Sequence, residues 1–223
     1  MPDLSDGYHN TRRRVSELVA ELDAADLATR VPACPDWTVH QLVAHMSGIP
    51  EALTSGSFPA GDLQAWLDQI VEERQDVPVP DLLDRWEACA AGTSGIVDGG
   101  GSLMFIDVVS HEHDLRGAVG QGGARGTSEV RATVQLLLDL LAPAITEAGL
   151  GALVVDSGEV RWASQFARPG CTIRVDPWEA IRVLQSRRTP EEVRALPITG
   201  DIGPYLAVFA DHSPLPATSL GEA

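Results

Sequence analysis

The chain has 223 residues, of which 44% are apolar, and its mean hydropathy is close to zero. These values are typical of a globular protein with a sizeable hydrophobic core, and no stretch approaches the roughly 18 apolar residues that a membrane-spanning helix needs. The formal net charge of -16 would repel phosphate backbones, so we expect neither a nucleic-acid nor a membrane partner. The N-terminus lacks the apolar core of a signal peptide, which predicts a cytoplasmic location.

The chain has three cysteines, Cys34, Cys89 and Cys171. Their number is odd, their spacing is long and they form no CxxC pair. We therefore expect free thiols rather than a disulfide framework or a structural zinc cluster.

Helical patterns dominate the first 150 residues. Residues 11–28 carry Val15, Leu18, Val19 and Leu22 at the spacing of an amphipathic helix, and the arginines at 12–14 are typical of its solvated face. Thr38 and Gln41 form a capping-box pattern that predicts the start of the next helix. Further helices are predicted over 61–75, 81–97, 102–119 and 128–148, and Gly120 is the stop signal of the helix over 102–119.

Beyond Gly149 the pattern changes. Short β-branched runs separated by turn residues predict strands over 152–156, 159–164 and 171–176. Helices are predicted over 177–187, 190–196 and 200–212, and the last ten residues look like a loose tail. The sequence therefore predicts an α+β protein, with a helix-bundle domain over 1–150 and a small α+β domain over 151–223.

The segment DVVSHEHDLRGAVG, residues 107–120, concentrates acids and histidines on one predicted helix. Asp107 and His111 are four residues apart and share a face, and Asp114 continues the same stripe. His45 lies on the apolar stripe of its own helix, where a buried ring needs a polar partner. One interpretation is a site of two histidines and one carboxylate that binds a divalent metal between helices and keeps positions open for water or substrate.

The alternative interpretation is structural. An Asp–His pair at this spacing often forms only a surface hydrogen bond, and a lone histidine such as His45 is often a core residue with a hydrogen-bond partner. Asp114 is either an exposed acid or a partner that accepts a hydrogen bond from a ligating histidine. Spacing alone leaves both interpretations open.

Several motifs together resemble the mycothiol-dependent maleylpyruvate isomerase family, which belongs to the DinB-like metal-binding four-helix bundles. They are CPDWTV at 34–39, VAHM at 43–46, the Asp107–His111–Asp114 series, and the C-terminal stretch at 176–206. The resemblance implies a divalent metal, usually zinc, held by His45, Asp107 and His111. The sequence departs from the family at one position, because the family's carboxylate is typically Glu and here it is Asp107.

The resemblance also implies a thiol cofactor, mycothiol or a similar low-molecular-weight thiol, and a small electrophilic substrate. A metal stabilises the thiolate form of a bound thiol, which otherwise has a pKa of about 8.5. Addition of the thiolate followed by its departure after bond rotation gives cis–trans isomerisation, and addition alone gives thiol transfer. The candidate catalytic residues are His45, Asp107 and His111, with Asp114 in support.

Anionic groups of a substrate or cofactor would need positive partners in this acidic chain. Arg85, Arg187 and Arg188 are the candidates, although Arg187 and Arg188 at a predicted helix end also fit compensation of the helix dipole. Two other functions fit the same residues. One is a hydrolase that uses zinc-activated water, and the other is a non-catalytic ligand-binding or regulatory protein of the same fold; an iron oxygenase has no independent support.

Overall fold

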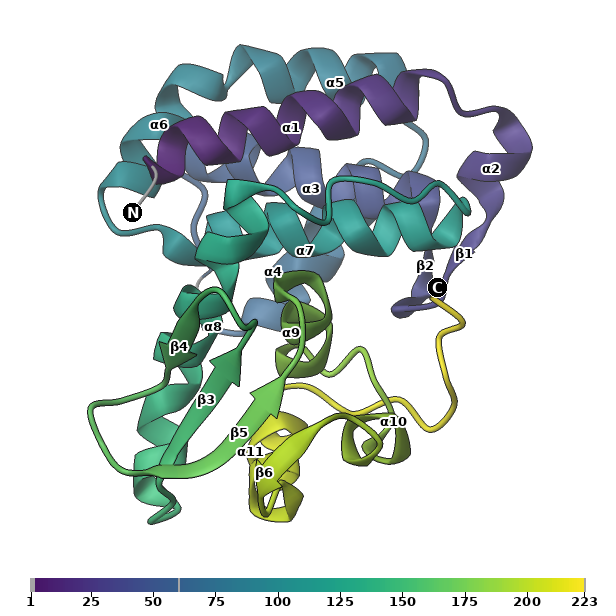
Figure 1. Ribbon diagram of the computed structural model, residues 1–223. Helices are drawn as coiled ribbons and strands as arrows, with labels where there is room; N and C mark the ends of the chain where they lie inside the picture. Colours follow the sequence, from purple (N-terminus) through teal and green to yellow (C-terminus); the bar gives the residue numbers. More distant parts are fainter. Residues whose placement is uncertain (1–2, 60, 223) are drawn as a thin grey trace. The chain divides into compact units, whose positions relative to one another are not determined.

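The computed structural model describes residues 3–59 and 61–222, and the chain divides into two compact units, Met1–Gly123 and Ala124–Ala223. The first unit is helical apart from one short strand pair, and the second combines a sheet with helices (Figure 1). The predicted α+β class is therefore confirmed. In the described part of the chain, no helix has the length and apolar character needed to cross a membrane.

The first unit is a helix bundle. Its helix α1 packs against α5, α6 and α7, and α3 packs against α4, α5, α6 and α7. The bounds are α1 (Leu4–Ala20), α2 (Ala24–Ala28), α3 (Val39–Thr54), α4 (Leu63–Glu72), α5 (Val79–Ala88), α6 (Ala90–Asp98) and α7 (Ser102–Ala118). A short antiparallel pair, β1 (Arg30–Val31) and β2 (Cys34–Thr38), precedes α3.

Capping residues set where the first helices begin. The Asp3 carboxylate accepts hydrogen bonds from the backbone N–H groups of Ser5 and Asp6, so α1 begins earlier than predicted. Asp23 caps α2 with a capping box. The prediction of one continuous helix over 11–28 is therefore wrong, because a second N-cap inside that span starts a new helix.

Later helices follow the predicted pattern more closely. The Thr38–Gln41 capping box is confirmed, since the Thr38 N–H donates to Gln41 Oε1 at 2.9 Å and the Gln41 N–H donates to Thr38 Oγ1 at 3.3 Å. Gly120 follows α7 with φ of 65°, the left-handed conformation expected of a helix stop. The helix predicted over 81–97 is instead two helices that meet at Cys89.

Two of the three arginines near the N-terminus are not solvated. Arg12 is only 5% exposed, and Arg14 donates two hydrogen bonds to Glu112, at 3.0 and 2.7 Å. Glu112 is fully buried on α7 and also accepts from Arg116. The buried Glu112 explains the position of Arg14, because a buried charge requires ionic partners. Arg12 pairs instead with Glu87 of α5.

The second unit contains a four-stranded sheet with the order β4-β3-β5-β6 (Figure 1). The central strands β3 (Ala152–Asp156) and β5 (Pro169–Arg174) are parallel, and β4 (Arg161–Ala163) and β6 (Ile198–Gly200) pair antiparallel at the edges. Three of these strands were predicted and β6 was not. The helices are α8 (Ser128–Glu147), α9 (Pro177–Leu184), α10 (Pro190–Arg194) and α11 (Gly203–His212).

The boundary between the compact units differs from the boundary predicted near residue 150. Helix α8 belongs to the second unit, where it packs against β3, β4, α9 and α11. Sequence patterns place α8 with the preceding helices because they report its helical period and not the surface it covers. The predicted loose tail is also anchored, because Glu222 accepts hydrogen bonds from the buried Arg182 and from Arg188.

Candidate metal centre

Helices α3 and α7 of the first unit bring His45, Asp107 and His111 together. Asp107 Oδ1 lies 3.2 Å from His45 Nε2 and 3.3 Å from His111 Nε2. Asp107 and His111 are one helical turn apart on α7, so the predicted shared face is observed. His45 projects from α3, which packs against α7. The arrangement therefore joins two helices through one carboxylate oxygen.

The donor set fits a divalent metal. One ligand atom from each of these three residues lies within 4.8 Å of the others. Ligands about 2.1 Å from a tetrahedral ion lie roughly 3.4 Å apart, close to the two separations at Asp107. Asp107 thus reaches both histidines although its side chain is one methylene shorter than glutamate. Two imidazoles and one carboxylate suit zinc or a first-row transition metal.

The three side chains perturb one another electrostatically. Burial raises the pKa of Asp107, but the charges of His45 and His111 outweigh burial and hold it well below its usual range. Burial lowers the pKa of His111, and the Asp107 carboxylate together with hydrogen bonds outweighs it and raises that pKa well above its ordinary value. Asp107 is therefore an anion at neutral pH, and it attracts a cation.

Asp114 supports His111 from the far side of the ring. His111 Nδ1 lies 2.9 Å from Asp114 Oδ2, and the Asp114 side chain is fully buried. This hydrogen bond fixes the tautomer that leaves His111 Nε2 free to bind a cation. Cys34 of β2 lies beside the same carboxylate, with its Sγ 3.9 Å from Asp114 Oδ2.

His45 is held by packing. Its ring centroid lies 4.7 Å from that of Trp37 and 5.0 Å from that of His111. His45 Nδ1 is buried and has no hydrogen-bond partner among the described residues. Contact with the tilted Trp37 ring therefore orients a ring that lacks the carboxylate support given to His111.

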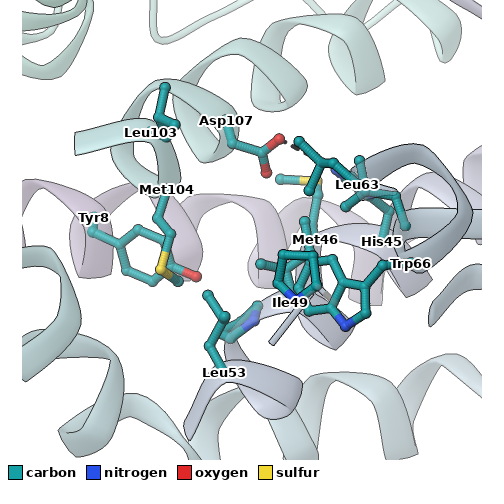
Figure 2. Close-up of a pocket in the computed structure, with 13 residues that line it drawn as sticks. Tyr8, His45, Met46, Ile49, Leu53, Leu63, Trp66, Leu103, Met104 and Asp107 are labelled. Carbon is teal, nitrogen blue, oxygen red and sulfur yellow. Dashed lines mark hydrogen bonds and ion pairs between the residues drawn. The ribbon is translucent and has the colours of Figure 1, made fainter. Parts of the chain in front are cut away.

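The donor cluster borders an apolar pocket of about 290 Å³ in the first unit. Figure 2 shows side chains from α1, α3, α4 and α7 around it, and both His45 and Asp107 belong to its wall. Tyr8 is the third polar residue of the lining. Its hydroxyl accepts a hydrogen bond from Trp86 Nε1 at 2.9 Å, and burial, opposed by that bond, raises the pKa of the phenol well above its ordinary value.

The predicted anion-binding arginines lie away from this pocket or in the second unit. Arg85 does not line it and lies 4.0 Å from Glu51 beside a separate hollow. Arg188 is buried in the second unit and bonds to Glu179 and Glu222. Arg187 donates to the carbonyl of Gln185 in that unit. Their role toward an anionic group remains a prediction.

Sequence reasoning missed three residues around the cluster. Cys34 was predicted only to be a free thiol, and Trp37 and Tyr8 were given no role at the site. The three cysteines are free, as predicted, and Cys34, the first residue of β2, lies beside Asp114 of α7. The adjacency of the CPDW segment to the helix that bears His45 was the available signal.

Residues 8–98 match the family model described as the mycothiol maleylpyruvate isomerase N-terminal domain. The match includes the CPDWTV and VAHM motifs and supports the resemblance drawn from them. The matched segment contains His45 and ends before Asp107 and His111. No curated protein and no solved structure matches the chain.

Proposed function

We propose that the protein is a metal-dependent enzyme that uses a small thiol, mycothiol or a similar compound, to isomerise or conjugate a small electrophile. The observation that carries this proposal is the convergence of His45, Asp107 and His111 beside a pocket whose wall includes His45 and Asp107, in a chain whose residues 8–98 match the family domain. The thiol part of the proposal depends on the family match alone.

His45 Nε2, an oxygen of Asp107 and His111 Nε2 would hold the metal, with zinc as the first choice for this donor set. When bound, such an ion would supply positive charge that stabilises a thiolate at neutral pH. The three protein ligands would be fewer than the four of a closed structural site, as in catalytic zinc sites.

The chain's own side chains prepare this site before any ligand enters. Asp114 holds the proton on His111 Nδ1, and Trp37 restricts rotation of the His45 ring. Asp107 contributes the negative charge that offsets a divalent cation. The apolar pocket wall would pack against the electrophile, and the protonated Tyr8 hydroxyl is available as a hydrogen-bond donor there.

Turnover measurements with and without a thiol test the proposal. Zinc-reconstituted protein should convert an activated cis alkene only when mycothiol or a surrogate thiol is present. Asp107→Asn, which keeps the shape and removes the charge, should reduce the rate at least a hundredfold. His40→Gln is the matched control, because His40 lies on the same helix α3 but contacts the Val77 carbonyl.

Two results would contradict thiol chemistry. Ester hydrolysis that is independent of thiol and lost in Asp107→Asn would indicate the zinc-water hydrolase instead. An absence of turnover with every thiol and electrophile, in protein that retains its metal, would indicate a ligand-binding protein of the same fold.

A further inference from the structure

The lining of the pocket differs in character from what a charged substrate requires. Ten of its thirteen lining residues are apolar, and they include Ile49, Leu53, Leu63, Trp66 and Leu103. No arginine or lysine is among these thirteen residues, all of which the structure describes. The polar lining consists of Tyr8, His45 and Asp107.

Two helical stripes connect the donor cluster to the apolar wall. On α3, His45, Ile49 and Leu53 follow one another at intervals of four residues. On α7, Leu103 lies four residues before Asp107. Residues four apart share a helix face, so a molecule lying against the donor cluster also contacts aliphatic side chains one and two turns away (Figure 2).

The pocket is open to ligands from solvent. Leu63 and Leu103 belong to its wall and are 55% and 61% exposed. Phe58, which directly precedes the lining residue Pro59, is 64% exposed. Exposed apolar groups of this size at a pocket indicate a surface that binds an apolar ligand.

From this lining we infer that the pocket takes an uncharged, apolar electrophile, in which one carbonyl oxygen accepts a hydrogen bond and alkyl or aryl groups occupy the wall. A dicarboxylate would lose its hydration against aliphatic side chains and would gain no arginine or lysine partner from the lining. The chain's net charge of -16 also disfavours its approach. This inference rests on the proposed function, since it names the substrate class of that site.

Tyr8 is the lining group suited to the carbonyl. Its oxygen already accepts the Trp86 N–H, so its own O–H is directed to another acceptor. Burial keeps the phenol protonated at neutral pH. The Tyr8 hydroxyl is thus a neutral donor in the pocket, which matches a ketone, aldehyde or ester better than a carboxylate.

Equilibrium binding of dialkyl succinates tests the inference without any turnover. These saturated diesters cannot add thiols, and displacement of the uncharged dye N-phenyl-1-naphthylamine reports their binding to metal-free and zinc-loaded protein. Each added methylene should tighten binding about three- to fourfold until the wall is covered, the fold-change that corresponds to about 0.8 kcal/mol. Succinate dianion should bind at least a hundredfold more weakly than diethyl succinate.

A charge placed on the wall provides a reciprocal test. Leu53→Arg, at a half-buried position near the end of α3, should weaken dibutyl succinate at least tenfold and improve succinate. Val160→Arg is the matched control, because Val160 is 44% exposed in the second unit and outside the pocket lining, and it should leave both affinities unchanged. Leu53→Ala serves if the arginine variant fails to fold, with a smaller loss expected only for the diesters.

The results separate this inference from the proposed function. Tight diester binding without thiol-dependent turnover of diethyl maleate would support the apolar pocket and overturn the proposed reaction. Thiol-dependent turnover of maleate that exceeds turnover of diethyl maleate would support the reaction and overturn the apolar substrate class. Succinate binding as tight as diester binding, or affinity independent of alkyl length, would also overturn the inference.

Discussion

Replacing Asp114 by Asn tests the structural logic of the metal centre without touching a metal ligand. The Asp114 carboxylate accepts the hydrogen bond from His111 Nδ1 at 2.9 Å and is fully buried. Asn has the same shape and retains an acceptor oxygen, but it has no charge. The hydrogen bond therefore weakens. The Asn NH2 group can also turn toward His111 Nδ1 and donate to it, which favours the tautomer with its proton on Nε2.

The size of the effect follows from the kind of bond that is lost. A hydrogen bond to a charged group contributes about 1.5–3 kcal/mol and a neutral one about 0.5–1.5 kcal/mol. The difference of about 1.4 kcal/mol corresponds to a tenfold change in affinity. We expect Asp114→Asn to weaken zinc binding at least tenfold, within the range of about 10- to 100-fold typical of groups that support metal ligands.

A chelator competition titration, with all proteins at the same pH, measures this change. Glu112→Gln is the matched control, because Glu112 is an equally buried carboxylate on the same helix that bonds to Arg14 and Arg116 instead of the cluster. Its zinc affinity should equal that of the native protein. Unchanged affinity in Asp114→Asn, or an equal loss in Glu112→Gln, would refute the reasoning.

Three further predictions concern stability and pH. Glu112→Gln should lower the free energy of unfolding by about 2–3 kcal/mol, measured in urea, because two arginines lose a buried anion; a loss below about 0.5 kcal/mol would contradict this. Glu222→Gln should destabilise the second unit by a similar amount by weakening the bonds from Arg182, and proteolysis of the C-terminus should accelerate; an unaltered cleavage rate would argue against an anchored tail. Burial lowers the pKa of His111, but the Asp107 carboxylate outweighs burial and raises that pKa. Protonation of His111 therefore stabilises the metal-free fold, and this stabilisation is fully present below about pH 6.5. It is lost as the pH rises through the raised pKa. The increase in Tm on adding zinc should therefore grow with pH, and an increase that shrinks between about pH 6 and about pH 8 would be the contrary result.

The sequence predicts the donor cluster well because helical periodicity is a local property. Residues four apart share a helix face wherever the helix lies in the fold, so the pairing of Asp107 with His111 can be predicted from their spacing. The apolar stripe around His45 likewise directs its ring into the bundle. Pairing of the two helices, which brings these residues within 3.3 Å, depends on tertiary packing. The family resemblance supplied that pairing where the periodicity of each helix could not.

Other features of the fold were missed because the local sequence pattern does not report on them. Asp23 reads as one more polar residue in a long helix, although its side chain caps a new one. The hydrophobic pattern of α8 is the same whether it covers a bundle or a sheet. The contacts of Arg14 and Tyr8 depend on Glu112 and Trp86, which lie 98 and 78 residues away along the chain. Such long-range polar pairs leave no periodic signal.

The binding of one divalent ion by His45, Asp107 and His111 is the central claim of this account, and metal stoichiometry tests it most directly. Elemental analysis of zinc-reconstituted protein should give close to one equivalent per chain. His45→Ala and His111→Ala should each retain little metal, and His40→Gln should retain the native amount. Absence of metal from the native protein after reconstitution, or an equal metal content in all four proteins, would contradict the claim.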